Sequence, residues 1–219
     1  PVCYVINTHV HPDHTFGNAA FKADKPTYVS HEKFPAALQA RQEYFARVFK
    51  DTLGPAYDGT EFIIPSLTVA IGQPVSLDLG ERTITLTAYT TSHTDHDLTI
   101  FDNISKTLWT GDLLFTERTP VIDGSLNGWI KLTTQFQTMD LNFVIPGHGP
   151  ATDTWQQGFS DQLRYLSVIR DGVRAIIADL GTIEEASKTV GLQEQNNWEL
   201  YDSYHRRNVT ASFVELEWE

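Results

Sequence analysis

The sequence predicts a single α/β layered domain over residues 1–219, and three observations lead to this expectation. Short strand-like segments separated by turn signals fill the first three-quarters of the chain. Amphipathic helical spacing fills the last quarter. No repeat and no Gly/Ser-rich linker divides the chain, and 41% hydrophobic residues supply enough apolar material for one core.

Composition excludes several classes of protein. The 16 Lys and Arg against 28 Asp and Glu give a formal net charge of −12, which disfavours binding to the phosphate backbone of nucleic acids. Cys3 is the one cysteine, so neither an internal disulfide nor a Cys-rich metal site is expected. No apolar run reaches the roughly 18 residues of a membrane span. We therefore expect a small-molecule substrate, without nucleic acid and without membrane insertion.

The strands are predicted from β-rich runs bounded by turn residues. The first run, 1–6, has no leader or cap before it, so we expect the numbering to begin inside a longer gene product. Two hairpins are expected, around Gly80-Glu81 and around Asp102-Asn103. The predicted strands, in order, are 1–6, 25–30, 75–79, 82–89, 98–101, 106–109 and 142–145.

The helices are predicted from apolar residues at three- and four-residue steps. A helix is expected over 32–50, and the Gly- and Pro-rich segment 51–73 is expected to be a loop or lid. A long helix should follow Asp153, as its cap, and end at Gly181. Thr182 and Glu185 form a capping box for a short helix, and a last helical stretch covers 198–216.

The strongest functional signal is His9-Val10-His11-Pro12-Asp13-His14, directly after the first strand. His9 and His11, two apart in extended chain, project to one side. The turn at Pro12 brings Asp13 and His14 to a second point, so the motif supplies ligands to two adjacent metal ions. Imidazole and carboxylate ligands suit Zn²⁺, and Fe or Mn remain open alternatives.

Three further ligand-type residues stand where predicted strands meet loops. They are His93, Asp112 and His148, and glycines stand next to the last two, as Gly111, Gly147 and Gly149. Glycine lets the backbone bend sharply and approach a site closely. Each residue alone would be an ordinary turn residue, but together with the first motif they indicate one metal site.

With these residues in this order, the sequence resembles the metallo-β-lactamase superfamily over nearly its whole length. The resemblance implies an αββα sandwich with the metals at one edge, between two sheets. It implies that His9, His11 and His93 hold one metal. Asp13, His14 and His148 would hold the second, and Asp112 would bridge both.

The superfamily normally has several strands before the first motif, and this chain has almost none. The resemblance therefore implies a first sheet that is incomplete, or one that a partner segment completes. Strand exchange between chains, and hence a homo-oligomer, is an expectation that follows.

Two segments resemble one branch, the quinoprotein relay system zinc metallohydrolases, also called SoxH-like proteins. They are 111–125, with the sequence GDLLFTERTPVIDGS, and the tail 204–218. This resemblance implies an exported protein, periplasmic or secreted, that is encoded near quinoprotein dehydrogenases.

The expected mechanism is hydrolysis by a hydroxide that bridges two Zn²⁺ ions, which lower the pKa of water to about 7. Asp13 would orient the nucleophile, and Asp95 or Asp97 would accept hydrogen bonds from ligating histidines. The expected substrate is a small ester, thioester, lactone or amide. A bridging aspartate such as Asp112 accompanies thioester, lactone and phosphodiester hydrolysis in the superfamily more than dedicated β-lactam hydrolysis.

Substrate contacts are predicted for Arg118, as a partner for a carboxylate, with Lys131 as a second candidate. An ion pair of Arg118 with Glu117 or Asp123 is an equal alternative. His96 is predicted to contact substrate or to support a ligand, and a solvated loop histidine is the alternative.

Two other functional interpretations remain open. One is an iron-dependent oxidoreductase on the same scaffold, although that branch expects a glutamate at the position of His11. The other is a metal-bound accessory protein of a quinoprotein system, without turnover.

Overall fold

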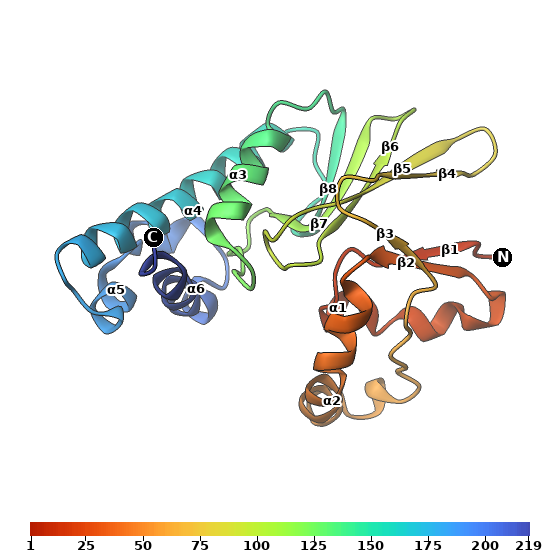
Figure 1. Ribbon diagram of the computed structural model, residues 1–219, viewed down its shortest axis with the longest axis horizontal. Coiled ribbons are helices and arrows are strands. Elements are labelled where there is room, and N and C mark those ends of the chain that lie inside the picture. The colour runs from red at the N-terminus through yellow and green to blue at the C-terminus, as the bar shows by residue number, and fades with distance from the viewer.

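The computed structural model describes residues 1–219 and contains two β-sheets (Figure 1). The first sheet is parallel, with the order β1-β2-β3, and consists of β1 (Tyr4–Ile6), β2 (Thr27–His31) and β3 (Leu67–Val69). The second has the order β4-β5-β6-β7-β8, antiparallel except for the parallel pair β7–β8. Its strands are β4 (Val75–Asp78), β5 (Thr83–Ala88), β6 (Leu98–Asp102), β7 (Thr107–Phe115) and β8 (Phe143–His148).

Helices lie beside each sheet (Figure 1). Those of the first half are α1 (Pro12–Thr15), η1 (Asn18–Asp24), α2 (Phe34–Leu53) and η2 (Gly54–Tyr57), where η marks a 3₁₀ helix. Those of the second half are α3 (Leu126–Phe136), α4 (Trp155–Ala178), α5 (Ile183–Thr189), η3 (Leu192–Asn197) and α6 (Tyr201–Leu216). No helix combines the length and the apolar character that a membrane crossing requires.

Three hydrophobic cores fill the spaces between the layers. The alternating strand β5 buries Ile84, Leu86 and Ala88 against residues of β2, β3 and β6, so this core fills the space between the sheets. The largest core joins β7 and β8 to the helices α3 to α6, with Trp129 and Phe159 fully buried. A small core lies under α2. The predicted α/β layered fold is confirmed, because helix, sheet, sheet and helix follow one another across the molecule.

Several predicted elements differ in detail. The first strand covers Tyr4–Ile6, and α2 extends to Leu53. Asp153 does not cap α4, whose N-cap is Thr154 without a side-chain hydrogen bond. The capping box is confirmed in part, since the Thr182 hydroxyl accepts a hydrogen bond from the Glu185 backbone N–H at 3.2 Å. Helix α3 was not predicted, although Ser125 caps it by accepting from Gly128 N–H.

Candidate metal centre

The seven predicted ligands come from segments that meet at one edge of the two sheets. His9 follows β1, and His11 precedes α1, whose single turn carries Asp13 and His14. His93 lies in the turn between β5 and β6, and His148 ends β8. Asp112 lies inside β7 rather than after it, where the β7–β8 register is irregular. The structure thus brings all seven side chains into two adjoining groups.

The first group consists of His9, His11, His93 and Asp112. Nδ1 of His11 lies 3.0 Å from Nε2 of His9 and 3.3 Å from Nε2 of His93. Oδ2 of Asp112 lies 3.6 Å from His9 Nε2 and 3.4 Å from His93 Nε2. Ligands about 2.0–2.1 Å from a tetrahedral Zn²⁺ lie roughly 3.3 Å from one another, so the spacing matches such a centre.

The second group consists of Asp13, His14 and His148. Asp13 Oδ2 lies 3.3 Å from His14 Nε2 and 3.2 Å from His148 Nε2. Asp112 also reaches this group, with Oδ1 3.1 Å from His14 Nε2 and Oδ2 3.4 Å from His148 Nε2. One carboxylate therefore contacts both groups.

Unpaired polar atoms show that the site fits cations. His14 Nε2 and Asp112 Oδ1 are buried without a hydrogen-bond partner, because their 3.1 Å approach lacks hydrogen-bond geometry. Buried polar atoms are rarely left unsatisfied. In the first group three imidazole nitrogens face one another, and protons cannot satisfy all of these contacts at once. Metal ions at the two positions would satisfy both sets of atoms.

The electrostatics differ between the groups when no cation is bound. Burial lowers the pKa of His9 well below its usual value and that of His93 to about 4, so both rings are neutral. His14 is also buried, but its contacts with Asp112 and Asp13 outweigh burial and raise its pKa to about 10. The same two carboxylates raise the pKa of His148 to about 9. The second group therefore carries protons that a metal must displace.

Outer contacts fix the ring orientations in the first group. His11 Nε2 lies 3.1 Å from Asp123 Oδ2, and Arg207 donates to the other oxygen of Asp123 at 2.9 Å. His93 Nδ1 donates to the Val121 carbonyl at 2.7 Å. Such contacts set the tautomer and raise the basicity of a ligating imidazole.

The prediction that Asp95 or Asp97 supports a ligating histidine is wrong. Asp95 bonds to His96, and Asp97 accepts from the backbone and hydroxyl of Thr94. Asp123 takes this place instead. The sequence indicated Asp123 only as an ion-pair candidate for Arg118, because no local spacing links it to His11.

Glycine permits the close packing around Asp112. A Cβ on Gly147 would overlap Oδ1 of Asp112. Gly111 has φ +52°, and a Cβ there would lie 2.6 Å from Thr8 Cβ. Gly147 therefore allows β8 to pack against the Asp112 carboxylate, and Gly111 allows the segment after β1 to pack against β7 next to it.

A cavity of about 780 Å³ opens over the two groups. It lies between α2 on one side and α6 with the loop after β7 on the other (Figure 1). Besides five of the metal-site residues, its lining includes Arg41, Tyr44, Val48 and Phe49 of α2, Arg118 and Thr119 of the loop, and Tyr204 and Arg207 of α6. A cavity with converging polar groups is the expected form of an active site.

The three predicted substrate contacts lie in different places. Arg118 lines the cavity, with its Nε 3.8 Å from a Glu199 oxygen, rather than pairing with Glu117 or Asp123. His96 is fully buried, bonds to Asp95 at 2.7 Å, and does not line the cavity. Lys131 is exposed on α3 and is also outside the lining.

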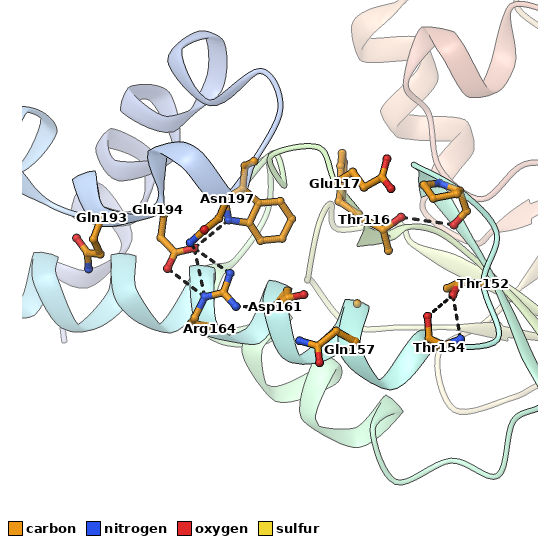
Figure 2. Close-up of a pocket in the computed structure, with 14 residues that line it drawn as sticks. Thr116, Glu117, Thr152, Thr154, Gln157, Asp161, Arg164, Gln193, Glu194 and Asn197 are labelled. Atoms are coloured by element: carbon orange, nitrogen blue, oxygen red, sulfur yellow. Dashed lines mark hydrogen bonds and ion pairs between the residues drawn. The ribbon is translucent and has the colours of Figure 1, made fainter.

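A second cavity, of about 740 Å³, is lined by residues of α4, of η3 and of the segment after β7, among them Arg164, Glu194 and Glu117 (Figure 2). Three of its four charged groups pair with one another, since Arg164 binds both oxygens of the buried Glu194 and also Asp161. Neither metal group lines it. Phe115 lines both cavities and stacks on His148, with ring centroids 4.9 Å apart. The cavity over the two groups is therefore the candidate active site.

Two facing sheets with helices outside, and a paired His/Asp cluster at their edge that could hold metal ions, define an αββα domain. The family model described as the metallo-β-lactamase superfamily matches residues 1–148. The chain belongs to this superfamily, whose members are typically metal-dependent hydrolases. No curated protein sequence shows significant similarity to it.

Solved structures agree with the fold. A metallo-β-lactamase from Pontibacter korlensis matches with a TM-score of 0.57 and 20% identity, over 76% of this chain and 70% of that protein. An archaeal metallo-β-lactamase superfamily protein from Sulfolobus tokodaii matches with a TM-score of 0.57 and 20% identity, over 74% and 66%. The DIM-1 metallo-β-lactamase exposed to ceftazidime matches with a TM-score of 0.56 and 16% identity, over 74% of this chain and 66% of that protein. The chain thus spans 66–70% of the length of these proteins.

Proposed function

We propose that this chain is a binuclear metal-dependent hydrolase that cleaves a small ester, thioester, lactone or amide. The observation that carries the proposal is the position of Asp112, whose oxygens approach His9 and His93 of one group and His14 and His148 of the other. A structural metal site is closed and mononuclear in the usual case, whereas two adjoining centres beneath an open cavity are suited to catalysis.

The two centres have distinct ligands. His9, His11 and His93 would hold one ion, Asp13, His14 and His148 the second, and Asp112 would contact both. Zn²⁺ suits this set of nitrogen and oxygen donors. Two such ions supply a water of lowered pKa and Lewis-acid stabilisation of a developing oxyanion.

The protein's own residues position the reactants. Asp13 lines the cavity, and Oδ2 faces His14 and His148, while Oδ1 makes no hydrogen bond within the protein. This free oxygen can accept a hydrogen bond from a water molecule and so orient that water towards a carbonyl. The rings of Phe115 and Phe49 add apolar surface to the lining of the cavity.

The test combines metal content with turnover. Metal-free protein is reloaded with Zn²⁺, Fe²⁺ or Mn²⁺, and bound metal is counted by elemental analysis. Each form is assayed against esters, thioesters, lactones and β-lactams. We expect two zinc ions per chain and hydrolysis of at least one ester class. Asp112→Ala should abolish both zinc binding and hydrolysis. Asp140→Ala, at an exposed position, should change neither property.

Other outcomes identify the competing functions. Stoichiometric iron with a visible absorption band and no hydrolysis would show an oxidoreductase. Metal binding without any turnover that depends on Asp112 would show an accessory protein. Either result contradicts the hydrolase proposal.

We further propose membership of the quinoprotein relay system zinc metallohydrolase branch and an exported, periplasmic or secreted, location. In support, both segments that resemble this branch contribute to the cavity, 111–125 through Arg118 and Asp123 and 204–218 through Tyr204 and Arg207. Fractionation of the host cell tests the location, and recovery in the cytosol would contradict it. Size-exclusion chromatography tests the proposed homo-oligomer, which a monomeric mass would refute.

A further inference from the structure

Two arginines of the cavity over the metal centre make no hydrogen bond with the protein through their side chains. Arg41 extends from α2, and its nearest carboxylate is Asp123 at 3.8 Å. Arg118 extends from the loop after β7, and its nearest carboxylate is Glu199 at 3.8 Å. Each guanidinium therefore keeps its five N–H donors for solvent or for a ligand.

Other arginines of the chain are used structurally. Arg207, which also lines the cavity, donates to Asp123 at 2.9 Å and so supports the orientation of His11. Arg164 binds Glu194, and Arg174 binds Glu219 through two hydrogen bonds of 2.8 Å. Arg41 and Arg118 thus line the cavity with one long ion-pair contact each and without a hydrogen-bonded partner.

The charge of the cavity contrasts with that of the chain. The chain carries −12, but the cavity is lined by three arginines and three carboxylates, those of Asp13, Asp112 and Asp123. Two divalent cations would make this lining strongly positive. Because charges beyond about 8 Å are screened at physiological salt, the local field decides which ligands enter.

An apolar strip accompanies the two arginines. Tyr44, Val48 and Phe49 lie on α2 and line the same cavity, and Tyr44 is 54% exposed. These side chains favour a short hydrocarbon segment between a charged end and a reacting carbonyl. A ligand with both features would use the donors and the apolar strip together.

We propose that Arg41 and Arg118 bind an anionic group, carboxylate or phosphate, at one end of the substrate whose carbonyl faces the metal centre. The planar guanidinium fork matches both anions, and the two arginines line the same cavity from different elements, α2 and the loop after β7. The reaction rests on the proposed hydrolytic function, whereas anion binding does not require turnover.

The first test measures binding without turnover. Zinc-loaded protein is titrated calorimetrically with three 4-nitrobenzyl ketones, in which a methylene replaces the scissile oxygen of a 4-nitrophenyl ester. They share a four-carbon chain and end in a methyl, a carboxylate or a phosphonate. We expect an anionic ketone to bind at least tenfold more tightly than the methyl ketone. The better of the carboxylate and the phosphonate identifies the preferred anion.

Variants assign the preference to the two arginines. Arg41→Gln and Arg118→Gln should each weaken binding of the anionic ketone about tenfold or more. The affinity for the methyl ketone should stay within about twofold of the wild-type value. Arg47→Gln, on α2 but outside the cavity, and Lys131→Gln, on α3, are matched controls and should change neither. A variant that retains the full preference would remove that arginine from the proposal. Equal binding of all three ketones would overturn it.

The second test uses the corresponding esters. The preference should recur in kcat/KM and arise mainly in KM, because the arginines lie away from the reacting bond. If the ketones bind as expected and no ester is hydrolysed, the hydrolase proposal fails while anion recognition stands. If esters are hydrolysed without regard to charge, anion recognition fails alone.

Discussion

Nε2 of His11 lies 3.1 Å from Oδ2 of Asp123, although 112 residues separate them along the chain. The other oxygen of Asp123 accepts from Arg207, so the carboxylate is held from two sides. Asp123 therefore favours a proton on His11 Nε2. The lone pair on Nδ1 is then directed at His9 and His93, where a metal ion is expected.

Asp123→Asn should lower the zinc affinity of the first group, His9, His11 and His93 with Asp112, and leave that of the second group unchanged. The amide removes the negative charge that holds the His11 tautomer, and outer contacts of this kind contribute about 10–100-fold to metal affinity. Competition with a chromophoric zinc chelator measures the affinity of each equivalent. Asp140→Asn, on an exposed carboxylate, serves as the control. Unchanged affinity for the first equivalent would show that Asp123 only binds Arg207.

Zinc binding should release protons mainly from the second group. The pKa values of His14 and His148, about 10 and about 9, keep both rings protonated at pH 7, whereas His93, with a pKa of about 4, is already neutral. A ligating imidazole must be neutral, so we expect about two protons released with the second equivalent and far fewer with the first.

Calorimetry at pH 7 in buffers of different ionisation enthalpy measures this release. The affinity for the second zinc ion should rise with pH up to about pH 9–10, because the protons that compete with zinc for His14 and His148 dissociate in that range. The affinity for the first zinc ion should depend less on pH in this range, because the lowered pKa values of His9 and His93 keep both rings neutral. Equal proton release by both equivalents would contradict the assignment of the two groups.

Asp97→Asn should flatten the pH dependence of stability in the metal-free protein. Burial raises the pKa of Asp97 to about 8, against about 3.9 in an unfolded chain. Between these values the folded state holds a proton that the unfolded state has lost, so the free energy of unfolding falls as pH rises from about 4 to about 8. Asparagine is neutral throughout and can keep both contacts with Thr94.

Urea denaturation at pH 5, 6, 7 and 8 tests this difference. The wild-type free energy of unfolding should decline relative to that of Asp97→Asn as pH rises, and the two curves should diverge most near pH 8. Asp58→Asn, at an exposed position, should follow the wild type. Parallel curves for Asp97→Asn and wild type would show that the carboxylate is ionised in the fold.

The sequence predicted the metal site better than the rest of the cavity, and the reason is physical. His9, His11, Asp13 and His14 lie within one strand end and one turn, so their directions follow from local geometry. Most of the strands were predicted because residues such as those of β5 alternate between a buried and a half-buried face.

Features that depend on tertiary placement were not predicted. Arg41 and Asp123 reach the site only because α2 and the loop before α3 fold over it, and neither carries a local motif. Helix α3 was missed for another reason. It is short and contains Gly128, a poor helix former, which is needed where the helix passes the Thr91 carbonyl so closely that a Cβ would overlap it.

Gly147→Ala should separate the folding of the chain from the assembly of its metal centre. The backbone of Gly147 is not in the left-handed region, so alanine introduces no conformational strain there. Its Cβ would overlap Asp112 Oδ1 and lie 2.7 Å from the Gly111 carbonyl carbon and 2.8 Å from the Asp112 backbone nitrogen. The carboxylate and the backbone that carries it must therefore shift, and both proposed metal positions lose the ligand they would share.

We expect Gly147→Ala to unfold cooperatively in the metal-free state and yet to retain less than one zinc ion per chain after dialysis. Circular dichroism melting and elemental analysis measure the two properties on the same sample. Gly17→Ala is the matched control, because a Cβ there meets nothing within 4 Å, and it should keep both ions. Two retained ions in Gly147→Ala would mean that Asp112 can move aside without losing its contact with either group, which contradicts the bridging role argued from its position.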